Sequence, residues 1–379
     1  MPSQMSSDKD SSTDRTPPDL DSEQSLIEQV RDARTSGTPL LIRGGASKAF
    51  YGNPTPAGQV LDCSTHRGVI AYEPTELAIT LRAGTPLAAL QALLAEHGQQ
   101  LPFEPPHFGG TATIGGAVAA GLSGPRRPYA GSCRDAVLGV RLLNGRGQAL
   151  AFGGRVMKNV AGYDVSRLLV GSLGVLAVLL EVSIKVAPMP VACMTLVQES
   201  APADALATMR RWARRGLPIG ATAWDSGRLY VRVHGGDAVL VRTRAQLGGE
   251  PLVDADAFWA DLREQRLAFF AGDEPLWRLS VAPATPLDQL ATESTEDPWL
   301  LEWGGALRWL RSHRPAADLR ALARGAGGHA TLFRPGAEGL PSDGVFAPLS
   351  PIQMRLHRNL KRGFDPDGLF NPGRLYPEL

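Results

Sequence analysis

The segment from Phe103 to Gly131, FEPPHFGGTATIGGAVAAGLSGPRRPYAG, decides the fold. Residues 109–121 contain five glycines, too many for a helix or a strand alone. Gly110 and Gly115 have the spacing of the two glycines in a P-loop, but Gly116 stands where the phosphate-binding lysine is needed. This excludes a nucleoside triphosphate site. A Rossmann site is excluded too, because no G-x-G-x-x-G follows a predicted strand.

What remains is a loop of glycine and alanine with the hydroxyls of Thr111 and Thr113 and no charged side chain between residues 109 and 121. Such a loop suits a backbone that approaches a large, planar, partly polar ligand, with amide donors for carbonyls and ring nitrogens. A purely structural role stays open, but it must account for this density of glycine.

A second stretch, residues 41–51, is a predicted strand that runs into Gly44 and Gly45. Consecutive backbone N–H groups without side chains accept phosphate oxygens, and the Ser47 hydroxyl can add a donor. The alternative is an ordinary tight turn.

A third stretch combines residues 157–164 with Gly171-Ser-Leu-Gly174. Lys158 and Asp164 flank an otherwise small, loop-like segment. Each charge is interpreted either as part of a site or as a solvated surface group.

The composition is that of an ordinary globular protein, with 379 residues, a net charge of +1 and 43% hydrophobic residues. The near-neutral balance argues against a nucleic-acid partner, which requires a basic face. Cys63, Cys133 and Cys193 lie far apart and form no CxxC pair. We expect no metal site, and an iron–sulfur cluster needs about four thiolates, more than this chain holds.

The N-terminal residues and the longest apolar run indicate the cellular compartment. Residues 1–21 are rich in Ser, Asp and Pro and lack the apolar run of a signal peptide, so we expect a disordered tail. The longest apolar run, residues 168–180, is shorter than the ~20 residues of a membrane-spanning helix. These features predict a soluble cytoplasmic protein.

Periodicity predicts the remaining elements, and the pattern changes after Pro190. Before that residue we expect helices at 21–35 and 85–96, a hairpin of strands at 136–143 and 148–152, and a long strand at 175–186. After it, helices at 203–215, 255–270 and 315–324 alternate with short strands at 229–233, 239–243 and 277–280. This change predicts a second domain of α+β type.

The three glycine stretches, in this order, resemble the FAD-binding domain of the vanillyl-alcohol-oxidase/p-cresol-methylhydroxylase (PCMH) flavoproteins, over residues 22–188. Within the family, the sequence is most similar to the small FAD-binding subunits of bacterial glycolate oxidases. The matching residues are Leu41-Ile-Arg-Gly-Gly45, Ala83-Gly84, Thr113-Ile-Gly-Gly116, Lys158 to Asp164, Gly171-Ser-Leu-Gly-Val175, Phe364-Asp-Pro and Asn371-Pro-Gly-Arg374.

The resemblance implies an α+β fold in which a two-subdomain FAD-binding domain of PCMH type spans 22–188. A smaller α+β cap domain over 189–345 would contact substrate or a partner subunit. The C-terminal segment, 346–379, would return to pack on the FAD domain. Residues 1–21 would remain a disordered tail.

The resemblance also implies the residues that hold FAD. The first glycine stretch would surround the pyrophosphate, the second would line the isoalloxazine ring and ribityl chain, and further residues would pack near the flavin and adenosine portions. In that order, they are Arg43, Gly44, Gly45, Ala46 and Ser47; Pro105, Gly109, Gly110, Thr111, Thr113, Ile114, Gly115 and Gly116; and Gly121, Gly131, Gly174 and Val175.

Departures from the family's pattern refine these expectations. Many relatives attach the flavin through a His in or just after the first glycine loop, where this chain has Ala46-Ser-Lys-Ala49, so we expect non-covalent FAD. Leu173 replaces a Glu that many relatives carry, which puts a substrate-facing role at that position in doubt. The large catalytic subunits carry an H-x-G-D-G-N-like motif; the nearest match, His234-Gly-Gly-Asp237, is interpreted as a hairpin turn.

Oxidising a 2-hydroxy acid requires a base for the hydroxyl proton and a cationic anchor for the carboxylate. The sequence identifies no convincing catalytic residue. His107, beside the flavin loop, is the best-placed candidate, with a packing or surface role as the alternative. Arg126 and Arg127 could anchor an anion, form a solvated pair or contact another subunit.

The resemblance thus implies an FAD-dependent oxidoreductase that acts on CH–OH groups as part of a glycolate oxidase complex producing glyoxylate. Its partners would be a larger FAD-containing catalytic subunit and an iron–sulfur subunit, with a small 2-hydroxy acid as substrate. Those partners would attach it peripherally to the inner membrane. Two alternatives remain, a self-sufficient oxidoreductase for a 2-hydroxy acid or sugar alcohol, and a non-catalytic scaffold subunit.

Overall fold

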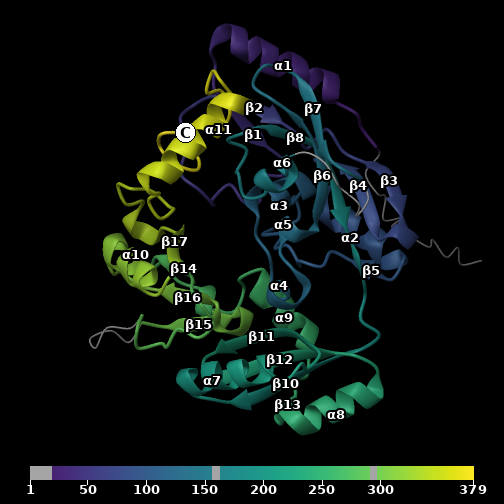
Figure 1. Ribbon diagram of the computed structural model, residues 1–379, viewed down its shortest axis with the longest axis vertical. Coiled ribbons are helices and arrows are strands. Elements are labelled where there is room, and N and C mark those ends of the chain that lie inside the picture. Colours follow the sequence, from purple (N-terminus) through teal and green to yellow (C-terminus); the bar gives the residue numbers. More distant parts are fainter. Residues whose placement is uncertain (1–18, 156–162, 291–296) are drawn as a thin grey trace, which may run out of the picture.

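The computed structural model describes residues 19–155, 163–290 and 297–379, which form two lobes (Figure 1). We call residues 19–188 the first lobe and residues 193–334 the second lobe. Among the described residues, no helix has both the length and the apolar character needed to cross a bilayer.

The first lobe is built on a five-stranded antiparallel sheet in the order β3-β4-β8-β6-β7. Its central strand, β8, is buried along almost its whole length because β4 and β6 flank it. The predicted hairpin and long strand are confirmed. The strands are β3 (Val69–Glu73), β4 (Ala78–Arg82), β6 (Val137–Leu143), β7 (Ala149–Gly153) and β8 (Val178–Lys185), with a separate short pair β5 (Gln99–Gln100) and β9 (Ala187–Pro188).

A smaller subdomain precedes this sheet and consists of helix α1 (Glu23–Ser36) and a parallel pair of strands, β1 (Leu40–Arg43) and β2 (Gln59–Asp62). Leu26 and Val30 lie one helical turn apart and pack with β1 and β2 into one apolar core. Because β1 ends at Arg43, the first glycine stretch begins where the strand stops.

The second glycine stretch contains a helix that the sequence did not predict, α3 (Ile114–Ala120). Thr113 caps its first turn by accepting a hydrogen bond from the Gly116 backbone, and Gly121 ends it in the left-handed conformation. Gly115 is required because a Cβ there would lie 2.7 Å from Ala83 Cβ. The other helices of this lobe are α2 (Leu87–Glu96), α4 (Arg127–Ala130), α5 (Cys133–Ala136) and α6 (Val165–Leu168).

The second lobe is an eight-stranded antiparallel sheet in the order β13-β10-β12-β11-β15-β16-β14-β17. The sheet divides into two halves of four strands, which meet at the β11–β15 pair. Counted from the outer edge inward, each half has its fourth, first, third and second strand in chain order. The strands are β10 (Cys193–Glu199), β11 (Ile219–Asp225), β12 (Arg228–His234), β13 (Glu250–Pro251), β14 (Leu276–Ser280), β15 (Trp299–Glu302), β16 (Leu307–Arg311) and β17 (His329–Arg334).

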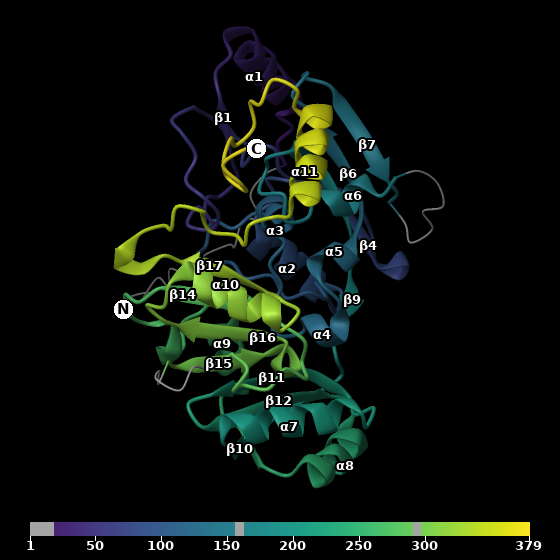
Figure 2. The same cartoon turned by 60° about the vertical axis from the view of Figure 1, so that its left-hand side comes forward.

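The two faces of this sheet have different neighbours. Helices α7 (Pro202–Ala213), α8 (Asp237–Leu247) and α10 (Ala316–Gly325) pack with one face (Figure 2). The other face contributes to an apolar cluster shared with helix α9 (Ala255–Arg263) and the first lobe. Side chains of the sheet that point to this second face therefore lie between the lobes.

Two expectations for the second lobe are wrong. Residues 239–243, expected as a strand, belong to α8, and His234 to Asp237 connect β12 to α8 instead of forming a hairpin turn. Of the expected tail at 1–21, residues 1–18 lie outside the described part, whereas Leu20 pairs with Arg67. Residues 156–162, which include Lys158, also lie outside it.

The C-terminal segment returns from the second lobe to the first (Figure 2). Helix α11 (Pro351–Phe364) places the Lys361 ammonium against the first lobe, where Nζ donates to the Val175 and Phe370 carbonyls and to the Asp365 carboxylate, each at 2.8 Å. Phe370 in turn forms a bridge with Leu40 at the start of β1. The tail thus reaches the strand that leads into the first glycine stretch.

Candidate functional site

Two adjoining pockets lie where β1, α3 and the C-terminal tail meet. The larger has an empty volume of about 780 Å³ and the smaller about 500 Å³, both counted to their open mouths. They form one continuous cavity because they share seven lining residues. These are Ile42, Gly44, Thr113, Gly116, Ala119, Leu173 and Asn371.

The first wall is a close contact between the two glycine stretches, which we call the glycine clasp (Gly44, Gly45, Thr111 and Thr113). A Cβ on Gly44 would lie 2.5 Å from Thr113 Oγ1, and one on Gly45 would lie 1.4 Å from the Thr111 carbonyl oxygen. Thr111 Oγ1 also donates a 2.5 Å hydrogen bond to the Gly45 carbonyl. Only glycine allows the two backbones to approach this closely.

The second wall comes from the C-terminal tail. Asn371 accepts a 2.8 Å hydrogen bond from the Ile42 backbone N–H and donates a 2.7 Å bond to the Leu173 carbonyl. A Cβ on Gly174 would lie 2.7 Å from Asn371 Nδ2, which explains the glycine there. Arg374 donates to the carbonyls of the loop after β1, at 2.6 Å for both Ala49 and Tyr51 and 3.1 Å for Asn53.

The cavity brings together about half of the residues expected to hold FAD. Nine line it, namely Arg43, Gly44, Gly45, Ala46, Ser47, Thr113, Gly115, Gly116 and Gly174. Eight do not, namely Pro105, Gly109, Gly110, Thr111, Ile114, Gly121, Gly131 and Val175. Of these, Ile114 and Val175 are fully buried in the core, whereas Gly109 and Gly110 are exposed.

Several lining residues were not expected. Asn371 and Arg374 were recognised only as part of the family's tail, and no local signal connects them with β1. Lys48 follows directly on the glycine stretch, lines the larger pocket and donates a 3.2 Å bond to the His107 carbonyl. Burial lowers the pKa of Lys48 to about 8, against the smaller opposing effect of Glu264.

His107 lies outside the cavity. Its Nε2 is 2.9 Å from Gln91 Oε1 on α2, and its backbone N–H donates to the Glu264 carboxylate. Burial lowers the pKa of His107, with Glu264 opposing the shift. The contacts with Gln91 and Glu264 are those of a packed histidine that fixes the loop before the second glycine stretch.

The two arginines that follow that stretch also have structural partners. The Arg126 backbone N–H donates to Glu104, and its buried side chain lies near Arg232. The Arg127 guanidinium stacks over the Trp303 ring at 4.5 Å. Both arginines therefore belong to the contact between the lobes.

The chemistry of the cavity fits a ligand with phosphates and an aromatic ring. Its lining has three cationic side chains, Arg43, Lys48 and Arg374, and no acidic residue within the described part of the chain. The deeper pocket is lined by small or apolar side chains such as Ala83 and Leu179. The residues present thus fit FAD, with cations for its pyrophosphate and a narrow apolar space for a ring.

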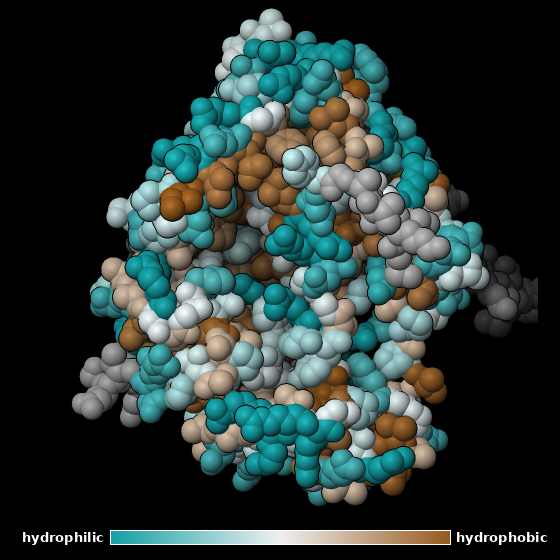
Figure 3. Space-filling model, in the orientation of Figure 1, coloured by the Kyte–Doolittle hydropathy of each residue, from teal (hydrophilic) through white to brown (hydrophobic). Residues whose placement is uncertain are grey.

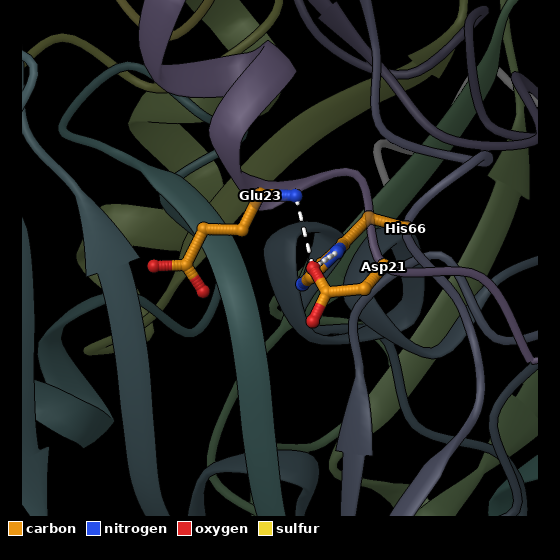
Figure 4. A group of neighbouring side chains, drawn as sticks. All are labelled: Asp21, Glu23 and His66. Atoms are coloured by element: carbon orange, nitrogen blue, oxygen red, sulfur yellow. Dashed lines mark hydrogen bonds and ion pairs between the residues drawn. The ribbon is translucent and has the colours of Figure 1, made fainter.

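A separate group, Asp21, Glu23 and His66, has the composition of a metal site (Figure 4). Its carboxylates already have cationic partners, since Asp21 pairs with Arg82 at 3.0 Å and Glu23 pairs with Arg141 at 2.7 Å. The group therefore ties the start of α1 to the sheet.

Comparison with known proteins identifies the family. The FAD binding domain family matches residues 20–153. The glycolate oxidase subunit GlcE of Escherichia coli (strain K12) is 49% identical over 361 residues, which cover 95% of this chain and 99% of that subunit. D-lactate dehydrogenase of Archaeoglobus fulgidus is 32% identical over 50% of this chain and 43% of its own length.

One further relative and one solved structure extend the comparison. The glycolate oxidase subunit GlcD of Bacillus subtilis (strain 168) is 31% identical over 42% of this chain and 34% of its own length. A solved structure of alkyldihydroxyacetonephosphate synthase superposes with a TM-score of 0.65 over 92% of this chain and 74% of that chain, at 16% identity, which shows a shared fold. The chain therefore belongs to the family of the glycolate oxidase subunit GlcE, within the PCMH-type flavoproteins, and its cofactor is FAD.

Proposed function

We propose that this chain is the FAD-binding subunit of a glycolate oxidase complex that oxidises glycolate to glyoxylate. One observation carries this proposal, the 49% identity that extends over 99% of subunit GlcE. The cavity supports it, because the glycine clasp and the tail form a site suited to FAD.

The chain's own residues have a defined task in this function. Arg43, Ser47 and Lys48 supply a cationic and hydrogen-bonding wall for the FAD pyrophosphate, and Gly116 and Gly174 leave room for the ring. When bound, FAD supplies a hydride acceptor for the oxidation of a CH–OH carbon. The protein binds and orients FAD. The tail residue Asn371 fixes the backbone at Ile42 and Leu173, which line the cavity.

We also propose that the electrons leave through partner subunits, a larger FAD-containing catalytic subunit and an iron–sulfur protein. Cys63 and Cys133 are buried, Cys193 is exposed, and together they cannot ligate a cluster that needs about four thiolates. The proposed location is the cytoplasm, with the partners providing any attachment to the inner membrane.

Reconstitution tests this function. The complex assembled from this chain, the larger flavoprotein and the iron–sulfur subunit should reduce a dye acceptor when glycolate is added. Omitting only this chain should lower the rate to about a tenth or less. An undiminished rate without it would contradict the proposal, and glycolate-dependent reduction by this chain alone would favour the self-sufficient enzyme.

We expect the FAD to be held without a covalent bond. The lining side chain best suited to such a bond is Cys63, and burial raises the pKa of its thiol to about 12, which keeps it protonated and unreactive. Acid precipitation should therefore release the flavin to the supernatant, and Cys63→Ala should retain as much FAD as the wild type. Flavin fluorescence that stays with the denatured band would contradict this expectation.

A further inference from the structure

Helix α11 carries an apolar stripe of which one half is buried and the other half exposed. Leu360 and Phe364 pack against the apolar core of the first lobe. Ile352 and Leu356 continue the same stripe at intervals of four residues, and their exposed fractions are 66% and 54%. The space-filling view shows apolar side chains gathered over this helix (Figure 3).

A row of arginines borders the exposed half of the stripe. Arg355, Arg358 and Arg362 are exposed and follow one another at intervals of three and four residues, so they lie on one side of the helix. The helix contains no acidic residue, and its ion pair among the described residues is that of Lys361 with Asp365 on the inner side. Because the whole chain has a net charge of only +1, this basic character is local.

We call Ile352, Arg355, Leu356, Arg358 and Arg362 together the α11 surface. An apolar centre with an arginine border is the composition of a protein interface, in which arginine is enriched. The exposed apolar side chains lose contact with water when a partner covers them, and the arginines offer paired donors to carboxylates.

The helix presents this surface in one fixed position. At its N-terminus, Ser350 and Gln353 form a capping box, in which the Gln353 backbone N–H donates to Ser350 Oγ at 3.3 Å and the Ser350 backbone N–H donates to Gln353 Oε1 at 3.0 Å. On the inner side, the His357 and Tyr376 rings contact each other with their centres 6.0 Å apart. A surface ordered in advance loses little conformational entropy when a partner binds.

We infer that the α11 surface docks a protein subunit whose facing surface has an apolar patch bordered by acidic side chains. The apolar patch would cover Ile352 and Leu356, and the carboxylates would pair with the arginines. The identification of that subunit as a member of the glycolate oxidase complex rests on the proposed function, whereas the chemistry of the surface does not.

Two other occupants fit this surface less well. In a symmetric dimer with α11 against α11, the two rows of arginines would face each other and repel. An anionic membrane would attract the arginines, but a helix that lies in a membrane inserts a whole apolar face. Here Leu360 and Phe364 are already packed on the first lobe, which leaves two large apolar side chains exposed on α11.

The helix that carries this surface also supports the FAD cavity. Lys361 Nζ, on its inner side, donates to the carbonyls of Val175 and Phe370. The residues next to these two in the chain, Gly174 and Asn371, line the cavity. A subunit on the α11 surface would therefore contact the helix that holds this wall of the cavity in place.

Binding of the FAD-loaded chain to the preassembled pair of the larger flavoprotein and the iron–sulfur subunit tests this inference. Biolayer interferometry gives the Kd and the association rate. Leu356→Asp should raise the Kd at least about tenfold, because it removes an apolar contact and places a carboxylate against an acidic border. Arg355→Glu/Arg358→Glu should raise the Kd by a similar factor and lose most of the slowing of association by salt that the wild type shows.

Matched controls lie on two other helices. Val241→Asp on α8 replaces an apolar side chain that is 71% exposed, and Arg324→Glu on α10 reverses the charge of an exposed arginine. Both controls should bind the pair like the wild type. FAD content and the circular dichroism spectrum show that each variant has folded, because the inner side of α11 is unchanged.

Wild-type affinity for the pair in Leu356→Asp would overturn the inference. A dimer of the chain alone that this variant dissociates would then assign the surface to a second copy. Binding to vesicles of phosphatidylcholine and phosphatidylglycerol that this variant loses would assign it to a membrane. Absence of wild-type binding to the pair would overturn the inference too.

The proposed function can fail or survive separately. It survives an unchanged affinity in Leu356→Asp if the reconstituted complex still requires this chain for dye reduction. If dye reduction does not require the chain but Leu356→Asp still weakens binding to the pair, the proposed function fails and the docking surface stands.

Discussion

Replacing Gly45 with alanine should abolish retention of FAD during purification. A Cβ at this position would lie 1.4 Å from the Thr111 carbonyl oxygen, a backbone atom that cannot rotate away. The glycine clasp must therefore open, which displaces Arg43 and Ser47 from the phosphate wall. We expect the Kd for FAD to rise about 100-fold, equivalent to about 2.8 kcal/mol, as measured by titration of flavin fluorescence.

Gly110→Ala is the matched control in the partner stretch. Gly110 is exposed, and a Cβ there meets no atom within 4 Å, so this variant should keep wild-type FAD affinity. If Gly45→Ala keeps its flavin, the clasp is not part of the FAD site. Equal loss in both variants would indicate a general sensitivity of the loops to substitution.

Gly115→Asp should also abolish FAD retention, because the helix α3 has no room for a side chain at this position. The new side chain would meet Ala83, with its Cβ 2.8 Å from the Ala83 carbonyl oxygen, so the substitution displaces α3 from β4. Flavin occupancy equal to that of the wild type would contradict the assignment of α3 to the cavity wall.

Lys361→Met should lower the free energy of unfolding by about 3–5 kcal/mol, because it leaves the buried Asp365 carboxylate without its cation. The exposed fractions of the two side chains are 8% for Lys361 and 0% for Asp365. The Val175 and Phe370 carbonyls lose a donor as well. Urea unfolding followed by circular dichroism measures the loss.

Arg362→Met provides the control on the same helix. Arg362 is exposed and bonds only to nearby residues of α11, Arg358 and Asn359, among the described residues. Its replacement should change stability by less than about 0.5 kcal/mol. A Lys361→Met variant as stable as this control would show that the tail contributes little to the first lobe.

The sequence was sufficient for most of the first lobe, because its signals are local. The hairpin of β6 and β7 follows from strand periodicity around a turn, and the first glycine stretch, singled out by its paired glycines, lines the cavity. By contrast, the bond between Ile42 and Asn371 joins residues 329 positions apart, which no local pattern can reveal.

Helices α3 and α8 were missed for physical reasons. Glycine disfavours a helix by about 1 kcal/mol per residue, yet α3 keeps Gly115 because its close approach to Ala83 excludes a side chain. In α8, the alternation of Val239, Val241 and Thr243 predicted a strand. The buried residues are instead Leu240, Thr243 and Leu247, at helical spacing.

The surroundings of the His107 side chain were also beyond the reach of sequence reasoning. His107 was preferred because it lies next to the glycine stretch in sequence, but its side chain contacts Gln91 instead of the cavity. Proximity along the chain was a poor guide to proximity in the site.

Titration of the flavin-free chain with FAD tests the central claim most directly. We predict saturable binding of one FAD per chain, with quenching of the flavin fluorescence and complete release of the flavin by acid. Binding should be lost in Gly45→Ala and kept in Gly110→Ala. Absence of saturable binding to the folded wild-type chain would contradict the assignment of this cavity to FAD.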